Sequence, residues 1–257
     1  MPINIPTKHN KKLEQIVERI NQDVELHQMW KCANINAVDR SGINDHGEVH
    51  IRIVANIALK MLRLLMEAGI EPSVVKNYGL TNDDAEAIVV LAECLHDVGI
   101  AIHRENHEQF SLVLATPKVK ELLEGVYDVE GQVIMTSEVL HAIVAHHWDV
   151  PCLTIEAGVV KVADALDMTQ GRSRIPFEAG KVNIHSVSAA AIDSVTLKRG
   201  EVKPISIEIQ MSNSAGIYQL DQLLKRKLRN SSIADYVEIE AKIEAEVEKR
   251  LVKMYTF

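Results

Sequence analysis

The spacing of apolar residues changes near residue 175, and this change limits the folds open to the chain. Upstream of it, apolar side chains recur every three or four residues, as they do along one face of a helix. Downstream, the segment PISIEIQM alternates apolar and polar residues, with Ile205 and Ile207 on one face, which is typical of a strand. We therefore predict a mainly α-helical protein with a small C-terminal α+β domain. The helical domain would span residues 1–175 and the α+β domain residues 176–257.

Local signals indicate where the individual elements begin. Polar residues and a proline at capping positions predict helix starts near Asp45, Thr81, Thr116 and Ser137, with one more helix over residues 155–168. The segments DSVTLKRGE and PISIEIQM, joined by a glycine turn, predict a hairpin. The segment GIYQLDQLLKRKLRN predicts an amphipathic helix, and YVEIEAKI predicts a strand.

Charge and cysteine content exclude several classes of protein. The net charge of −8 argues against a general nucleic-acid coat, which needs a basic excess. The three cysteines are far apart and form no CxxC pair, which suits a reducing compartment and gives no zinc-knuckle spacing. No apolar run approaches the roughly 20 residues needed to cross a bilayer, and the first residues hold no apolar signal core. We expect a cytoplasmic protein without a membrane segment.

Histidines and carboxylates gather around the ends of the expected helices. His96 and Asp97 end the apolar stretch LAECLHDVGI, where a buried polar pair must be hydrogen-bonded, paired or bound to a metal. A single such histidine is usually a core residue with one hydrogen bond. Here, however, His50 and Asp164 add two more polar groups from two other apolar helices. Imidazole and carboxylate are the usual ligands of borderline divalent metals, so these four residues are candidate ligands.

The order of HIRIVA, LHDVG and KVADALD resembles the HD phosphohydrolase superfamily, whose pattern is H…HD…D. Two further motifs, HEQFSLVLA and AIVAHHWD, are similar to those of the metal-dependent phosphodiesterases that include the HD domain of ribonuclease Y and the HD-GYP proteins. The resemblance covers residues 46–175, although HHWDVP stands where the GYP tripeptide would be. It implies metal ligation by His50, His96, Asp97, His107, His146 and Asp164, with His147 either a further ligand or a hydrogen-bond partner of one.

The resemblance implies a two-metal hydrolase of a nucleotide or another small phosphoester. Asp97 would bridge two divalent cations that activate a water molecule for in-line attack, and Mn, Fe, Mg, Co, Ni and Zn all suit such ligands. Arg172 and Arg174 in the segment QGRSR are candidates for phosphate contact, because guanidinium groups bind phosphate in a bidentate manner. Arg104 and Lys161 are weaker candidates, and all four side chains could instead be solvated surface charges.

Other functions and partners stay open at this point. Some HD proteins that resemble this chain are diiron oxygenases, and a degenerate HD domain would only bind a nucleotide or a partner. The basic residues of LLKRKLRN could contact an acidic ligand or RNA, but we favour a solvated helix face. Because alternating strands with an exposed edge suit self-association, we also expect a homodimer.

Overall fold

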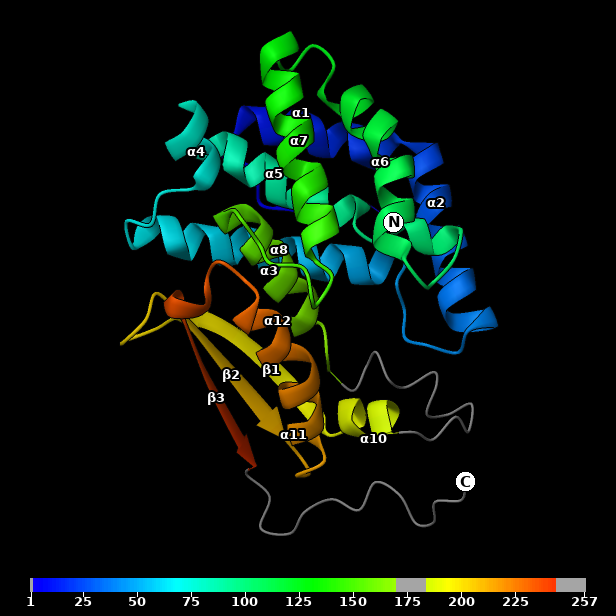
Figure 1. The fold of residues 1–257 in the computed structure, drawn as a ribbon, viewed down its shortest axis with the longest axis vertical. Helices are drawn as coiled ribbons and strands as arrows, with labels where there is room; N and C mark the ends of the chain where they lie inside the picture. The colour runs from blue at the N-terminus through cyan, green and yellow to red at the C-terminus, as the bar shows by residue number, and fades with distance from the viewer. Residues whose placement is uncertain (1, 170–183, 244–257) are drawn as a thin grey trace.

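The computed structural model describes residues 2–169 and 184–243, and it places a bundle of helices against a small sheet (Figure 1). The fold is mainly α-helical with a small C-terminal α+β region, as predicted. The helices of the first region are α1 (Lys11–Gln22), α2 (Val24–Asn34), a π-helix (Ile35–Arg40), α3 (Glu48–Glu67), α4 (Ser73–Tyr78), α5 (Asn82–Leu95), a 3₁₀ turn (Val98–Ala101), α6 (His107–Leu123), α7 (Val129–Ala145) and α8 (Ile155–Leu166).

The C-terminal region holds a three-stranded sheet in the order β1-β2-β3. Its elements are α10 (Ile184–Ala190), β1 (Ile192–Arg199), β2 (Ile205–Met211), α11 (Gly216–Gln219), a π-helix (Leu220–Leu224), α12 (Lys225–Arg229), a 3₁₀ turn (Ala234–Tyr236) and β3 (Val237–Ile243). The predicted hairpin of β1 and β2 is confirmed as an antiparallel pair. Strand β3 pairs with β2 in parallel, since the intervening helical segment carries the chain back along the sheet.

One hydrophobic core joins the two regions. Helices α3, α5, α7 and α8 bury their apolar faces against each other, and β1 and β2 pack against α3. Ile205, Ile207 and Ile209 of β2 are at most 1% exposed and belong to the same core. The predicted boundary at residues 175–176 lies outside the described residues, so the division into two domains stays a prediction.

Two predicted helix starts are wrong because the signals lie inside longer helices. Thr116 and Pro117 fall within α6, where the Thr116 hydroxyl donates to the Leu112 carbonyl at 2.6 Å. Pro117 cannot donate to the Val113 carbonyl, but Val113 is 68% exposed, so water can reach that side of the helix. Ser137 likewise lies in the middle of α7.

Two other predicted starts fall close to observed ones. Thr81 and Asp84 form the capping box of α5, as predicted. Near Asp45, α3 begins at Glu48 with Gly47 as its N-cap, and the Asp45 carboxylate accepts hydrogen bonds from the Gly47 and His50 amides instead. Over the described ranges, the helices are too short or too polar for any of them to cross a membrane.

Candidate metal centre

Ends of several helices bring the candidate ligands to one place. His50 lies in the first turn of α3, and His96 and Asp97 directly follow α5. The first residue of α6 is His107, and the residue after α7 is His146. Asp164, near the end of α8, completes the group. Residues predicted from separate motifs therefore meet in space, with ligand atoms that form groups within 4.8 Å of one another.

Close approach of α6 to the turn after α5 depends on a glycine. A Cβ atom at Gly99 would lie 2.1 Å from the His107 carbonyl oxygen, which is far inside van der Waals contact. The Gly99 amide donates to the Ser111 hydroxyl at 2.8 Å, and that hydroxyl donates to the His96 carbonyl at 2.6 Å. The glycine after LHDV thus lets α6 hold His107 beside the His96–Asp97 pair.

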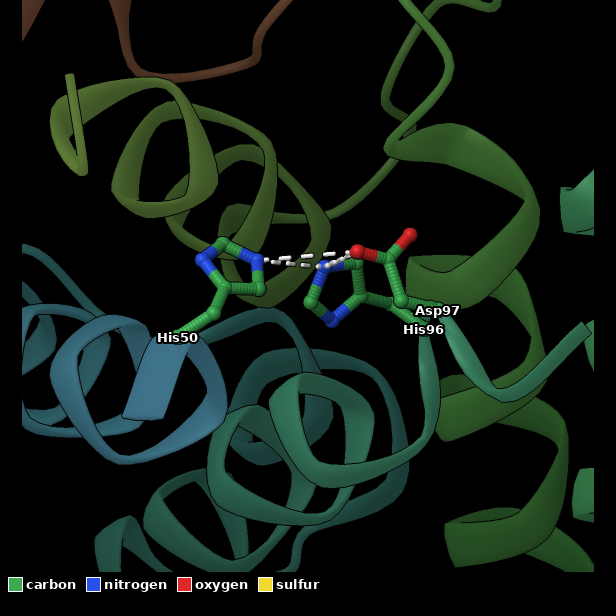
Figure 2. A group of neighbouring side chains, drawn as sticks. All are labelled: His50, His96 and Asp97. Carbon is green, nitrogen blue, oxygen red and sulfur yellow. Dashed lines mark hydrogen bonds and ion pairs between the residues drawn. The ribbon is translucent and has the colours of Figure 1, made fainter. Parts of the chain in front are cut away.

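One oxygen of Asp97 faces the first pair of histidines. Figure 2 shows the His50 ring from α3 and the His96 ring turned toward each other and toward the Asp97 carboxylate. Asp97 Oδ2 lies 3.2 Å from His96 Nε2 and 3.6 Å from His50 Nε2. Asp164 Oδ1 approaches the same two nitrogens at 3.4 Å for His50 and 3.7 Å for His96. With Asp97 Oδ2 itself, four potential ligand atoms therefore gather on this side.

The other oxygen of Asp97 faces a second pair of histidines. Asp97 Oδ1 lies 3.1 Å from His107 Nε2 and 3.8 Å from His146 Nε2. The two Nε2 atoms of this pair are 3.2 Å apart. Asp97 thus stands between two histidine pairs and presents one oxygen to each. Its role as a bridging metal ligand stays a prediction.

Hydrogen bonds at Nδ1 fix the tautomer and the orientation of the histidine rings. His96 Nδ1 donates to the Glu93 carbonyl at 2.9 Å, and His146 Nδ1 donates to the Ile143 carbonyl at 2.5 Å. Because a carbonyl oxygen can only accept, these bonds place the proton on Nδ1. In the neutral ring, the lone pair of Nε2 then points toward Asp97, as metal ligation requires.

His50 and His107 are supported in a related way. His50 Nδ1 donates a hydrogen bond to the Asp167 carboxylate at 2.7 Å. His107 Nδ1 lies 3.0 Å from the Arg104 carbonyl and 3.3 Å from Glu108 Oε2, both acceptors. The Arg104 guanidinium, which can only donate, approaches the same nitrogen at 2.7 Å. Nδ1 of His107 therefore has a donor as well as two acceptors beside it, while its Nε2 lies 3.1 Å from Asp97 Oδ1.

This arrangement fits a divalent cation. The Nε2 atoms of His50 and His96 lie 3.4 Å apart with their Nδ1 protons directed elsewhere. Two facing lone pairs in a buried site repel each other unless a proton or a cation lies between them. Imidazole nitrogens with carboxylate oxygens are the donor set that borderline divalent metals prefer. The residues present therefore fit divalent metal binding.

The histidines and carboxylates of the cluster shift one another's pKa values. Burial would raise the pKa of Asp97, but His96 and His107 hold it well below its usual range. Burial would lower the pKa of His96, but Asp97 and Asp164 raise it well above its usual range. In contrast, burial together with the charges of His96 and His107 lowers the pKa of His146 well below the usual value.

The remaining predicted site residues lie at varying distances from this cluster. His147 is half-buried beside the same cavity, but it is outside the described groups of mutually close ligand atoms, so its role as a ligand stays a prediction. Lys161 is buried away from the cavity and donates to the Val150 and Asn230 carbonyls. Arg172 and Arg174 lie outside the described residues.

A cavity of about 470 Å³ opens beside the cluster, within the usual range for small-molecule sites. Its wall includes Asp97, His107 and His146 from the helical region. It also includes Arg226 and Lys227 from α12. The sequence did not predict that these two residues lie at this site. The Lys227 ammonium donates to Asp164 Oδ2, so the expectation of a fully solvated basic helix is wrong for this residue.

Comparison with known proteins agrees with this geometry. Residues 47–169 match the family model described as the HD domain. The chain is 45% identical over 233 residues to the uncharacterized protein MJ1020 of Methanocaldococcus jannaschii, covering 91% of this chain and 90% of that protein. No solved structure gives a significant match. With the H…HD…D residues gathered around one carboxylate and an HD-domain match across them, the chain belongs to the HD superfamily of metal-dependent phosphohydrolases.

Proposed function

We propose that the chain is a metal-dependent phosphohydrolase or phosphodiesterase that acts on a nucleotide or another small phosphoester. The observation that carries the proposal is the position of Asp97, whose two oxygens face separate histidine pairs. Two divalent cations bound there would neutralise charge on a phosphoryl group and lower the pKa of a water molecule for attack on phosphorus. Membership of the HD superfamily supports the same reaction class.

The chain's own residues would contribute orientation and charge. The Nδ1 hydrogen bonds hold the imidazole rings in place, so little reorganisation is needed when ligands bind. Asp97 and Asp164 would supply the negative charge that attracts cations, because both pKa values lie well below the usual range for Asp. The cavity of about 470 Å³ has room for a small phosphoester beside them.

The test begins with protein stripped of metal by a chelator. Mn, Fe, Mg, Co, Ni and Zn are added back singly, and hydrolysis of bis-p-nitrophenyl phosphate and of a nucleotide panel is followed for each. We expect hydrolysis that needs a divalent metal and stops when the chelator returns. Iron binding with oxygen consumption but no phosphoester cleavage would contradict the proposal and favour a diiron oxygenase. Absence of metal binding in all conditions would favour a binding module.

The proposal leaves two partner predictions to separate experiments. A homodimer stays a prediction, and sedimentation analysis of the full chain tests it. The sequence leaves RNA binding open without indicating it, and a mobility-shift assay with single-stranded RNA tests it.

A further inference from the structure

Lys227 lies at the candidate metal centre although it comes from the C-terminal region. It belongs to α12, which packs against α8, the helix that carries Asp164. Its ammonium group donates to Asp164 Oδ2, while Asp164 Oδ1 faces His50 and His96. Lys227 therefore places a positive charge at the edge of the cluster, one carboxylate away from the histidines.

Burial of this lysine requires an explanation. Lys227 is only 8% exposed, and a buried ammonium is costly unless a partner offsets its desolvation. Neighbouring Lys225 shows the ordinary alternative, since it is exposed and pairs with Asp221 on the surface of the same helical segment. The two lysines are two residues apart, so the helix directs one to the cavity and the other to solvent.

Arg226 adds a second positive charge to the same cavity wall. Its guanidinium stacks over the Trp148 ring at 4.1 Å, and both side chains line the cavity. Stacking on an indole restrains a long arginine side chain without using its N–H donors. The guanidinium edge therefore remains able to bind an anion within reach of the cavity.

The cavity wall is rich in negative charge, so the two positive side chains matter for binding an anion there. Its wall carries the carboxylates of Asp97, Asp164, Asp167 and Glu108. Such a wall repels a phosphate until cations neutralise it. Divalent metal at the histidines would offset part of this negative charge. Lys227 and Arg226 add positive charge to the same wall from α12 of the C-terminal region.

We propose that Lys227 and Arg226 bind phosphoryl oxygens of the substrate, so that the C-terminal α+β region completes the substrate site of the helical region. This inference rests on the proposed phosphoester substrate. It assigns α12 an anion-binding role at that site. A purely structural Lys227, which only holds Asp164 in place, would affect metal binding and leave the phosphate affinity of the metal-loaded protein unchanged.

The test uses the full chain loaded with Mn²⁺ and titrated with inorganic phosphate by calorimetry. Lys227→Gln removes the buried charge, Arg226→Gln removes the stacked one, and Lys225→Gln is the matched control on the same helical segment. We expect Lys227→Gln to weaken phosphate binding by at least about tenfold, the usual size of a charge-assisted hydrogen bond, and Arg226→Gln by several-fold. Lys225→Gln should bind phosphate like the wild type.

Two further readouts separate binding from metal loss. Elemental analysis of each variant gives the metal content under the conditions of the titration. Trp148 fluorescence reports on the cavity, whereas Trp30, the other tryptophan, is 1% exposed and donates to the Cys94 carbonyl within the core. We expect phosphate to change the emission of the wild type, with the midpoint shifted to higher concentration in Lys227→Gln.

Fully loaded Lys227→Gln with wild-type phosphate affinity would overturn the inference. If Lys227→Gln does not bind Mn²⁺, the test rests on Arg226→Gln. Unchanged phosphate affinity in Arg226→Gln would then overturn the inference as well. Failure of the proposed function would give a different result: phosphate binding would still depend on Lys227, but no phosphoester would be cleaved. Hydrolysis with an unchanged KM in Lys227→Gln would count against the inference alone.

Discussion

The two sides of Asp97 differ in the number of protein donors that face them. On the Oδ2 side stand His50, His96 and Asp164, so this side has four donor atoms when Asp97 is included. On the Oδ1 side stand His107 and His146, which give three donors with Asp97. A full set of protein ligands favours tight binding, and an incomplete set leaves positions open for water or substrate. We therefore expect the Oδ2 side to bind metal more tightly.

Replacing the shared residue should have the largest effect. Asp97→Ala removes a ligand from both sides, so we expect loss of nearly all bound metal and a fall in activity of more than about a hundredfold, beyond the effect usual for supporting residues. Elemental analysis and the phosphodiesterase assay measure these losses, and circular dichroism checks that the helices still form. Retention of metal and turnover by Asp97→Ala would show that Asp97 is not a bridge.

Removing a ligand from one side should separate the two. We expect His107→Ala to lose the weaker ion and keep one metal per chain, because His50, His96 and Asp164 are untouched. In the matched variant, His50→Ala, the tighter ion should be weakened instead. Calorimetric titration of both variants with Mn²⁺ measures the two affinities. Equal losses in the two variants would remove the distinction between the sides.

A supporting carboxylate should affect only one side. Asp167 accepts from His50 Nδ1 at 2.7 Å and lies on the Oδ2 side. Asp167→Ala should weaken metal binding there by about 10–100-fold, the range known for such partners of ligand histidines. The affinity of the Oδ1 side should stay within about twofold. Competition with a chromogenic chelator measures both values, and a change confined to the Oδ1 side would contradict this assignment.

A carboxylate outside the cluster shows what burial does when no histidine offsets it. Glu138 on α7 is 7% exposed, its Oε2 has no hydrogen-bond partner, and burial and the charge of Glu156 raise its pKa. A raised pKa in the folded state means that stability is lost as the pH rises from the ordinary Glu value through the raised one. We therefore expect Glu138→Gln to stabilise the protein at pH 8 by about 1 kcal/mol.

Thermal melts at pH 8 and pH 4.5 measure the Glu138 effect. The gain from Glu138→Gln should shrink toward pH 4.5, because the raised pKa lets the wild-type carboxyl take up its proton in the folded state as the pH falls. Glu71→Gln, at an exposed position, is the control and should show no such dependence. A gain of equal size at both pH values would show that the charge of Glu138 is not the cause.

The sequence predicted the ligand cluster better than its surroundings. Short motifs such as LHDVG carry the ligands together with the helix end that positions them, so His96 and Asp97 could be placed without a structure. Lys227 could not, because a lysine in a basic amphipathic helix looks the same whether it faces solvent or a cavity. Its position depends on how α12 packs against α8, which is a tertiary contact between distant segments.

Helix boundaries show the same limit at smaller scale. The capping box at Thr81 is satisfied by local hydrogen bonds, and the sequence predicted it correctly. Thr116 and Pro117 carry an equally good local signal, yet packing against neighbouring helices extends α6 through them. The partner strand of β3 was also beyond prediction, because parallel pairing with β2 depends on the path of the helical segment between them.

Metal stoichiometry of the wild-type chain tests the central claim most directly. Native mass spectrometry of protein reconstituted with Mn²⁺ counts the ions bound per chain. Our account predicts two ions, bound in two steps, with the second lost first as free metal is lowered. One ion per chain at saturating metal would contradict a bridging Asp97 and would assign His107 and His146 a role other than metal ligation.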